Sequence, residues 1–369
     1  MVAPDWGLRG KRANLMLDSA RRPARVNHRA EGVFTMSKVT DRRSFLEGVA
    51  AVAASAAVSP LVGAAPTRSS DAERAVVELF KTLTPDQRRK VAFPWDHRDK
   101  DRGLLRTFVS NNWQVTGPHV VSDFYSMKQQ GLIHDIFKAL VDPQWYPKFI
   151  QQLKDDTDGR PWGQEQSIAL FGEPDGKFQF VMTGRHMTLR SDGDAEPHVA
   201  FGGPIFYGHA ASGFTEKAGH PGNVFWPQAL AANEVFAALD EGQKKKALVD
   251  RRPPESAVGF RKDPNDIPGL HLAEVKGEPL AKVENALAKL LEPFRKEDRD
   301  EVRACLAARG GLKACCLTFY KESDLGGDGV WDNWRLEGPA FVWHFRGTPH
   351  VHVWVNVADD PTVKLNARG

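Results

Sequence analysis

Residues 350–357 alternate between polar and apolar positions, and this period of two predicts a β-strand. Every second residue from Val351 to Val357 is a valine. Because alternate side chains of a strand share one face, the valines form an apolar side, and His350 and His352 lie together on the other side. We expect the valine side to face the core, which leaves the histidine side for chemistry.

A hairpin is predicted directly before this strand, where the short sequence Gly-Thr-Pro occupies residues 347–349. If these three residues form the loop, Arg346 faces His350 and His344 faces His352. Directly opposed Cβ atoms lie about 5 Å apart. Three histidines would then be within reach of one metal ion.

Apolar residues at intervals near 3.6 predict helices at residues 71–83, 122–140, 227–250 and 278–308, the last with a break near Pro293. Segments of period two, separated by turn residues, predict strands at residues 167–171, 178–183, 187–190 and 312–320. Together with the histidine hairpin, these elements predict an α+β fold, in which helices pack on an antiparallel sheet in a single large domain.

A further helix start is predicted at Thr84, where the sequence forms a capping box. Thr84 can accept a hydrogen bond from the backbone N–H of Gln87, whose side chain can reach back to the cap, and Pro85 fits the first helical turn. Residues 239–247 repeat the pattern of residues 83–91. Two interpretations stay open: an internal duplication, or helix-start chemistry that the two segments share.

An export signal is predicted near the N-terminus. Arg42 and Arg43 precede an apolar pair, and residues 48–65 are apolar, rich in alanine and end in small residues. The pattern resembles a twin-arginine signal and predicts a leader at residues 1–65, with Met36 as an alternative start. The apolar segment is too short and alanine-rich for a stable membrane span. The domain at residues 66–369 is therefore expected in the periplasm or outside the cell, exported by the twin-arginine machinery.

Composition narrows the class of partner. The net charge is only +3, which argues against a nucleic-acid partner, and 41% hydrophobic with 26% charged residues is ordinary for a globular domain. Three cysteines do not make a disulfide framework. Either Cys305 pairs with Cys315 or Cys316, or all three are buried free thiols.

Imidazoles are the candidate metal ligands. A His-x-His pair with a cross-strand histidine presents three nitrogens to one ion, as in catalytic zinc sites. The predicted ligands are His350, His352, His344 and, from a distant segment, His186, which is either a ligand or a general base. Zinc and copper suit such ligands best, and twin-arginine export favours a cofactor bound beforehand. The alternative is that the histidines are structural or lie on the surface.

Four short sequence motifs, at residues 170–174, 184–189, 338–339 and 350–352, resemble those of a known family. It is the bacterial secreted family catalogued as domain of unknown function 3500, and the resemblance begins at the helix around residues 83–92. In that family the second motif usually reads Gly-His-His-Leu, so Arg185 departs from the family pattern and His186 matches the second histidine. An acidic residue often stands where this chain has His344, which implies that either residue type can act there. The resemblance implies no established activity.

These observations lead to one main hypothesis and one rival. The main hypothesis is an exported protein that binds zinc or copper through the histidines and catalyses a metal-assisted hydrolytic or redox reaction on a small molecule. The rival is a non-catalytic envelope protein that binds a small ligand or partner through an aromatic pocket. The chain lacks the nucleophile-elbow, phosphate-loop and zinc-helix motifs, so no motif decides whether it is an enzyme.

Overall fold

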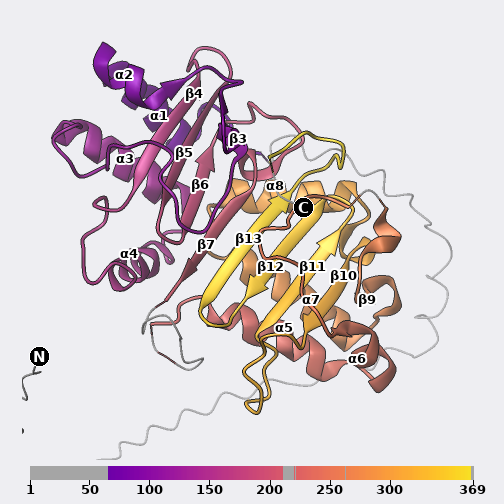
Figure 1. Cartoon of the computed structure of the whole chain (residues 1–369). Helices are drawn as coiled ribbons and strands as arrows, with labels where there is room; N and C mark the ends of the chain where they lie inside the picture. The colour runs from indigo at the N-terminus through magenta and orange to yellow at the C-terminus, as the bar shows by residue number, and fades with distance from the viewer. Residues whose placement is uncertain (1–64, 211–219, 221, 262, 367–369) are drawn as a thin grey trace, which may run out of the picture. The chain divides into compact units, whose positions relative to one another are not determined.

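The computed structural model of the chain describes residues 65–210, 220, 222–261 and 263–366 (Figure 1). The export signal predicted in residues 1–65 lies outside the described residues, apart from Ala65. Among the described residues, no helix combines the length and the apolar character that a membrane crossing requires.

One large sheet dominates the described part of the chain. Its strands follow the order β1 (Ala92–Phe93), β4 (Ser167–Gly172), β5 (Phe178–Gly184), β6 (Met187–Ser191), β7 (Ile205–His209), β13 (Val351–Val357), β12 (Phe341–Arg346), β11 (Asn333–Gly338), β10 (Cys316–Tyr320) and β8 (Leu248–Val249). β9 (Leu270–His271) also pairs with β10, and β2 (Arg98–Asp99) and β3 (Gly103–Leu104) form a separate small sheet. The run from β4 to β10 is antiparallel as predicted, whereas β1 and β8 pair in parallel, so the sheet is mixed.

Helices cover one face of this sheet (Figure 1). They are α1 (Asp71–Thr82), α2 (Pro85–Val91), α3 (Met127–Leu140), α4 (Tyr146–Asp155), α5 (Trp226–Ala238), α6 (Glu241–Ala247), α7 (Glu278–Leu291) and α8 (Lys296–Ala308). The valines of β13 pack into the core that these helices share with the sheet. The predicted α+β class, the single domain and the break near Pro293 are confirmed. The single helix predicted at 227–250 is wrong, because Asp240 caps a new helix there and β8 follows it.

The described residues form two halves that repeat one order of elements. Each half runs through a helix, a capping-box helix, a two-residue strand, two more helices and a four-stranded antiparallel meander. The capping box predicted at Thr84 is present, and Asp240 forms its counterpart. The strand order is symmetrical about the β7–β13 pair. Shared helix-start chemistry does not explain a common topology, so the structure supports the internal duplication.

The three cysteines are free and buried, which matches the second of the two predicted alternatives. Burial raises the pKa of the Cys315 thiol to about 12 and that of Cys316 to about 11. Both thiols are therefore protonated at neutral pH and are poor nucleophiles.

A buried ion pair links the first helix to the last one. Arg295, which precedes α8, donates two hydrogen bonds of 2.7 Å to the Glu73 carboxylate of α1 and one of 3.0 Å to Asp298. Ser191 of β6 also donates to Glu73 at 2.8 Å. Glu73 has no exposed surface, so its charge depends on these partners.

We predict that Arg295→Met lowers the free energy of unfolding by about 3–5 kcal/mol, because the substitution leaves the Glu73 carboxylate buried without its cation. The measurement is urea denaturation at neutral pH. Lys296→Met is the matched control, since the neighbouring Lys296 pairs with Asp300 at the surface and should change stability little. Equal stability of the two variants would contradict the role given to the buried pair.

Candidate metal centre

The histidine hairpin has a different register from the predicted one. Arg346 pairs with His352, and His344 pairs with Trp354. Five residues, not three, therefore separate the paired positions. The loop is wider because its two ends bind residues outside the hairpin: the Gly347 N–H donates to the Asp332 carbonyl at 2.8 Å, and Val351 pairs with His209 of β7.

His186 reaches the same place from the first half of the chain. It lies in the tight turn between β5 and β6, where Gly184 pairs with Met187. Its backbone φ of 52° lies in the left-handed region, which is uncommon for a residue other than glycine. Since β6 pairs with β7 and β7 pairs with β13, this turn lies beside the start of the strand that carries His352.

Three imidazoles converge at this point. The Nε2 atom of His352 lies 3.0 Å from Nε2 of His186 and 3.0 Å from Nε2 of His350. One ligand atom from each histidine lies within 4.8 Å of the others, and all three residues are buried. Two nitrogens bound to one tetrahedral zinc ion, each about 2.0–2.1 Å from it, lie about 3.3 Å apart. The spacing therefore fits a single small cation.

Two carboxylates orient these rings, a buried one from Asp156 and a half-buried one from Glu255. Asp156, which follows α4, binds Nδ1 of His186, and Glu255 binds Nδ1 of His352 at 2.9 Å. A carboxylate on Nδ1 places the ring hydrogen there and turns the Nε2 lone pair toward the centre, as second-shell acids do in metal sites. Sequence reasoning missed both acids, because no local pattern links them to histidines 30 and 97 positions away.

The electrostatics keep the acids ionised. Burial alone would raise the pKa of Glu255, but the hydrogen bond and charge of His352 and the charge of Arg346 lower it to about 2. Burial likewise opposes ionisation of Asp156, whose pKa is lowered by His186 and Arg185. The site therefore holds two fixed negative charges behind the imidazoles.

The backbones of β7 and β13 approach each other closely beside the three-histidine group. Gly208 of β7 lies opposite His352, and a Cβ atom at this position would lie 2.2 Å from the Val351 carbonyl oxygen. No other residue type fits there unless β13 moves. His209, the next residue, has its Nε2 3.1 Å from the side-chain oxygen of Asn223 and lies outside the three-histidine group.

The structure does not bring His344 into the group. Its Nδ1 accepts a hydrogen bond of 3.1 Å from Nε of Arg335 on the neighbouring strand. Burial, followed by the charges of Arg335, Arg252 and Arg346, holds the pKa of His344 well below its usual value. The predicted opposition of His344 and His352 is therefore wrong, because the wider loop moves His344 two residues along β13.

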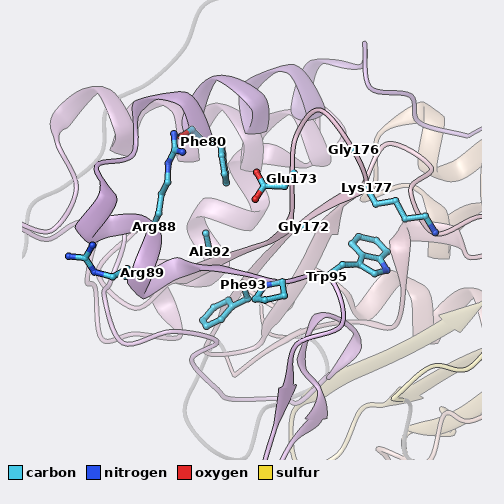
Figure 2. A pocket seen from close by; sticks show the side chains of 11 residues that line it. Phe80, Arg88, Arg89, Ala92, Phe93, Trp95, Gly172, Glu173, Gly176 and Lys177 are labelled. Atoms are coloured by element: carbon cyan, nitrogen blue, oxygen red, sulfur yellow. Dashed lines mark hydrogen bonds between the residues drawn. The ribbon is translucent and has the colours of Figure 1, made fainter.

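A separate hollow of about 800 Å³ lies at the β1 edge of the sheet (Figure 2). Aromatic and basic side chains line it, among them Phe80, Arg88, Trp95 and Lys177. The Arg88 guanidinium lies 4.4 Å from the Phe80 ring centroid, and the Lys177 ammonium lies 5.6 Å from that of Trp95. No residue of the histidine group lines this hollow.

Fold and site together define an α+β protein with a buried three-histidine group at the junction of its two halves. The chain belongs to the family described as protein of unknown function (DUF3500), whose family model matches residues 66–356. The predicted family is thereby confirmed. No curated protein and no solved structure matches the chain.

We predict that His352 stays neutral between about pH 5 and pH 8 in metal-free protein, because burial and the charge of Arg346 lower its pKa to about 3 against the effect of Glu255. The unfolded chain takes up this proton near pH 6.5. The stability contributed by neutral His352 is thus complete above that pH and is lost as the pH falls toward 3. A histidine NMR titration, with His352→Gln to assign the signal, tests this prediction; a midpoint near pH 6.5 would contradict it.

Proposed function

We propose that this protein binds one transition-metal ion, zinc or copper, through Nε2 of His186, His350 and His352. The observation that carries the proposal is the convergence of three buried Nε2 atoms, with the opposite nitrogen of two rings held by a carboxylate. Three buried imidazoles backed by carboxylates are a ligand arrangement that suits these metals.

A purely structural role explains the contacts less well. A structural histidine usually satisfies both ring nitrogens with protein donors or acceptors. Here the Nδ1 hydrogens point to Asp156 and Glu255, so the Nε2 atoms of His186 and His352 face each other as two acceptors at 3.0 Å. Lone pairs at this distance repel unless a proton or a cation lies between them. Burial disfavours the proton on His352, which supports a cation between the two nitrogens.

Three protein ligands leave a coordination position for water or substrate, as in catalytic zinc sites. A zinc ion so held supplies Lewis-acid chemistry for hydrolysis, and a copper ion supplies redox chemistry. The protein contributes burial, fixed ring orientation and two carboxylates that accept the Nδ1 hydrogens. We therefore propose a metal-dependent hydrolytic or redox activity on a small molecule.

The second candidate is a non-catalytic protein that binds a small ligand or partner at the hollow of Figure 2, with structural histidines. The aromatic lining of that hollow favours it. However, the basic side chains of Arg88 and Lys177 already lie near the two aromatic rings, and the candidate leaves the histidine arrangement unexplained. It predicts no response of stability to metals or chelators.

For the metal proposal, protein exported with its native signal should contain about one equivalent of zinc or copper by element analysis. Chelation should lower the melting temperature by several degrees, because binding to the folded state alone stabilises it. A His350→Ala/His352→Ala variant should lose the metal. Glu255→Gln should weaken metal affinity about 10–100-fold, since it disturbs only the orienting carboxylate.

His198→Ala is the matched control, because this exposed histidine pairs with Asp359 away from the group and its loss should leave the metal content unchanged. Less than about a tenth of an equivalent of any transition metal, unaltered in the double variant, would overturn the metal proposal. The same result, together with an unchanged melting temperature after chelation, would favour the second candidate.

We also propose export by the twin-arginine machinery to the periplasm or the cell exterior. The Arg42-Arg43 pair and the alanine-rich segment after it support this proposal. The Arg42→Lys/Arg43→Lys variant should remain inside the cell, as measured by fractionation. Arg21→Lys/Arg22→Lys, which changes the other arginine pair of the leader, is the control and should be exported normally. Normal export of both variants would refute this route.

A further inference from the structure

The face of the sheet opposite the helices is unusually polar in the second half of the chain. Most alternate residues of β10–β13 that point away from the helical core carry hydroxyl, amide, guanidinium, imidazole or carboxylate groups, and Cys316, Val342 and Trp354 lie among them. The polar residues of this face are all buried: Thr318, Tyr320, Asn333, Arg335, Glu337, His344, Arg346, His352 and Asn356. We call this set the polar face. Burying so many polar groups costs free energy unless each one finds a partner.

Several donors of the polar face lack a protein partner. Among the described residues, nothing accepts a hydrogen bond within 3.5 Å from the Tyr320 hydroxyl, Nη2 of Arg335, Nε2 of His344 or Nε of Arg346, and all four atoms are buried. Arg252, from the segment after β8, adds a buried Nε without a partner. Buried polar atoms in native proteins are nearly always bonded to protein, water or ligand.

The tautomer of His344 indicates that all of these unpartnered atoms are able to donate a hydrogen bond. Nε–H of Arg335 donates to Nδ1 of His344 at 3.1 Å. A neutral imidazole that accepts at Nδ1 carries its hydrogen on Nε2. The unpartnered Nε2 is therefore a donor, as are the guanidinium nitrogens, and the Tyr320 hydroxyl is able to donate. The complementary ligand must be an acceptor.

These donors lie together and next to the histidine group. Arg335 pairs directly with His344, and Arg346 pairs with His352. The ring centroids of Tyr320 and His344 are 6.2 Å apart. Nη2 of Arg346 also donates to the His350 carbonyl at 3.2 Å. A molecule bound to the donors would therefore lie beside the three Nε2 atoms.

The charged side chains at the polar face also favour a ligand that accepts hydrogen bonds, because they favour an anion. Four arginines lie in or over the polar face, and two carboxylates accompany them. Glu337 accepts from Nε of Arg261 at 2.7 Å and lies 3.4 Å from Arg335, while Glu255 pairs with Arg346. Arg252 has no side-chain ion pair among the described residues. The four guanidiniums thus exceed the two carboxylates, and an anion would balance the excess.

The first half of the chain provides an internal comparison. The corresponding face of its meander combines Ala169, Phe171 and Val181 with buried polar residues, among them Arg190. The guanidinium of Arg190 donates to the backbone carbonyls of Pro204, Arg106 and Phe108, so the protein itself satisfies this arginine. The unpartnered donors of the second half have no such protein acceptors, which favours a role in binding.

We propose that the polar face binds the oxyanion group of a small molecule, a carboxylate or a phosphate, through Arg335, His344 and Tyr320, with Arg252 and Arg346 supplying further positive charge. The inference that this molecule is the substrate of the metal centre rests on the proposed function. The anion site itself does not, because its donors are present whether or not a metal is bound.

The test measures binding of inorganic phosphate and of malonate to the purified, folded chain, by calorimetry and thermal shift, in metal-free and zinc-loaded protein. Sodium chloride at equal ionic strength is the reference. We expect saturable stabilisation by at least one oxyanion, and about tenfold weaker binding in Tyr320→Phe, since a hydrogen bond to a charged group is lost. Arg252→Met should weaken binding as well, and this half-buried residue is the safer change if a core variant folds poorly.

Tyr125→Phe is the matched control, because it removes an equally buried hydroxyl without a partner from the helical core. It should leave the anion affinity unchanged. Stabilisation no greater than that by chloride, or equal affinities in Tyr320→Phe, Arg252→Met and Tyr125→Phe, would show that only water bonds to these donors and would overturn the proposal. Anion binding that survives in a His350→Ala/His352→Ala variant without metal would leave this site standing even if the metal proposal failed.

Discussion

The antiparallel pairing of β7 with β13 is the contact on which the rest of the structure depends. It joins the two meanders into one sheet and fixes Val351 opposite His209 and His352 opposite Gly208. Through β6, the same register places His186 beside histidines that are more than 160 positions later in the chain. A slip of one residue would turn every side chain of β13 to the other face, which would place the valines among the polar groups and His352 among the helices. Core packing and site geometry are therefore set by one constraint.

Much of the fold follows from local pattern. The alternation along β13 correctly separates the valine side from the histidine side, and the residues at Thr84 correctly predict a capping box. The hairpin register could not be predicted in this way, because it depends on contacts with residues outside the hairpin. The bond from Gly347 to Asp332 and the pairing of Val351 with β7 widen the loop and move His344 away from His352. Short-range composition carries no information about such contacts.

The candidate site likewise combines residues that local pattern predicts with residues that it does not. His350 and His352 could be predicted as a pair because period two places them on one face. His186 could be proposed only from its sequence motif. Asp156 and Glu255 could not be found, since α4 and the segment after β8 bring them in from elsewhere. These acids nevertheless decide what the histidines can do. Without a carboxylate on Nδ1, either ring nitrogen could carry the hydrogen, and the three Nε2 lone pairs would have no fixed direction.

The repeated topology explains where the candidate site lies in this chain. Each half alone has one meander, and the centre of the sheet exists only where both halves meet. His186 comes from the first half, His350 and His352 come from the second, and the acids likewise come from one half each. On the face away from the helices, the first half combines the apolar residues Ala169, Phe171 and Val181 with Arg190, whose guanidinium donates to three backbone carbonyls. The corresponding face of the second half holds the buried donors that lack a protein partner. The two halves therefore share one topology and one helical core but differ in how the polar groups of this face are satisfied.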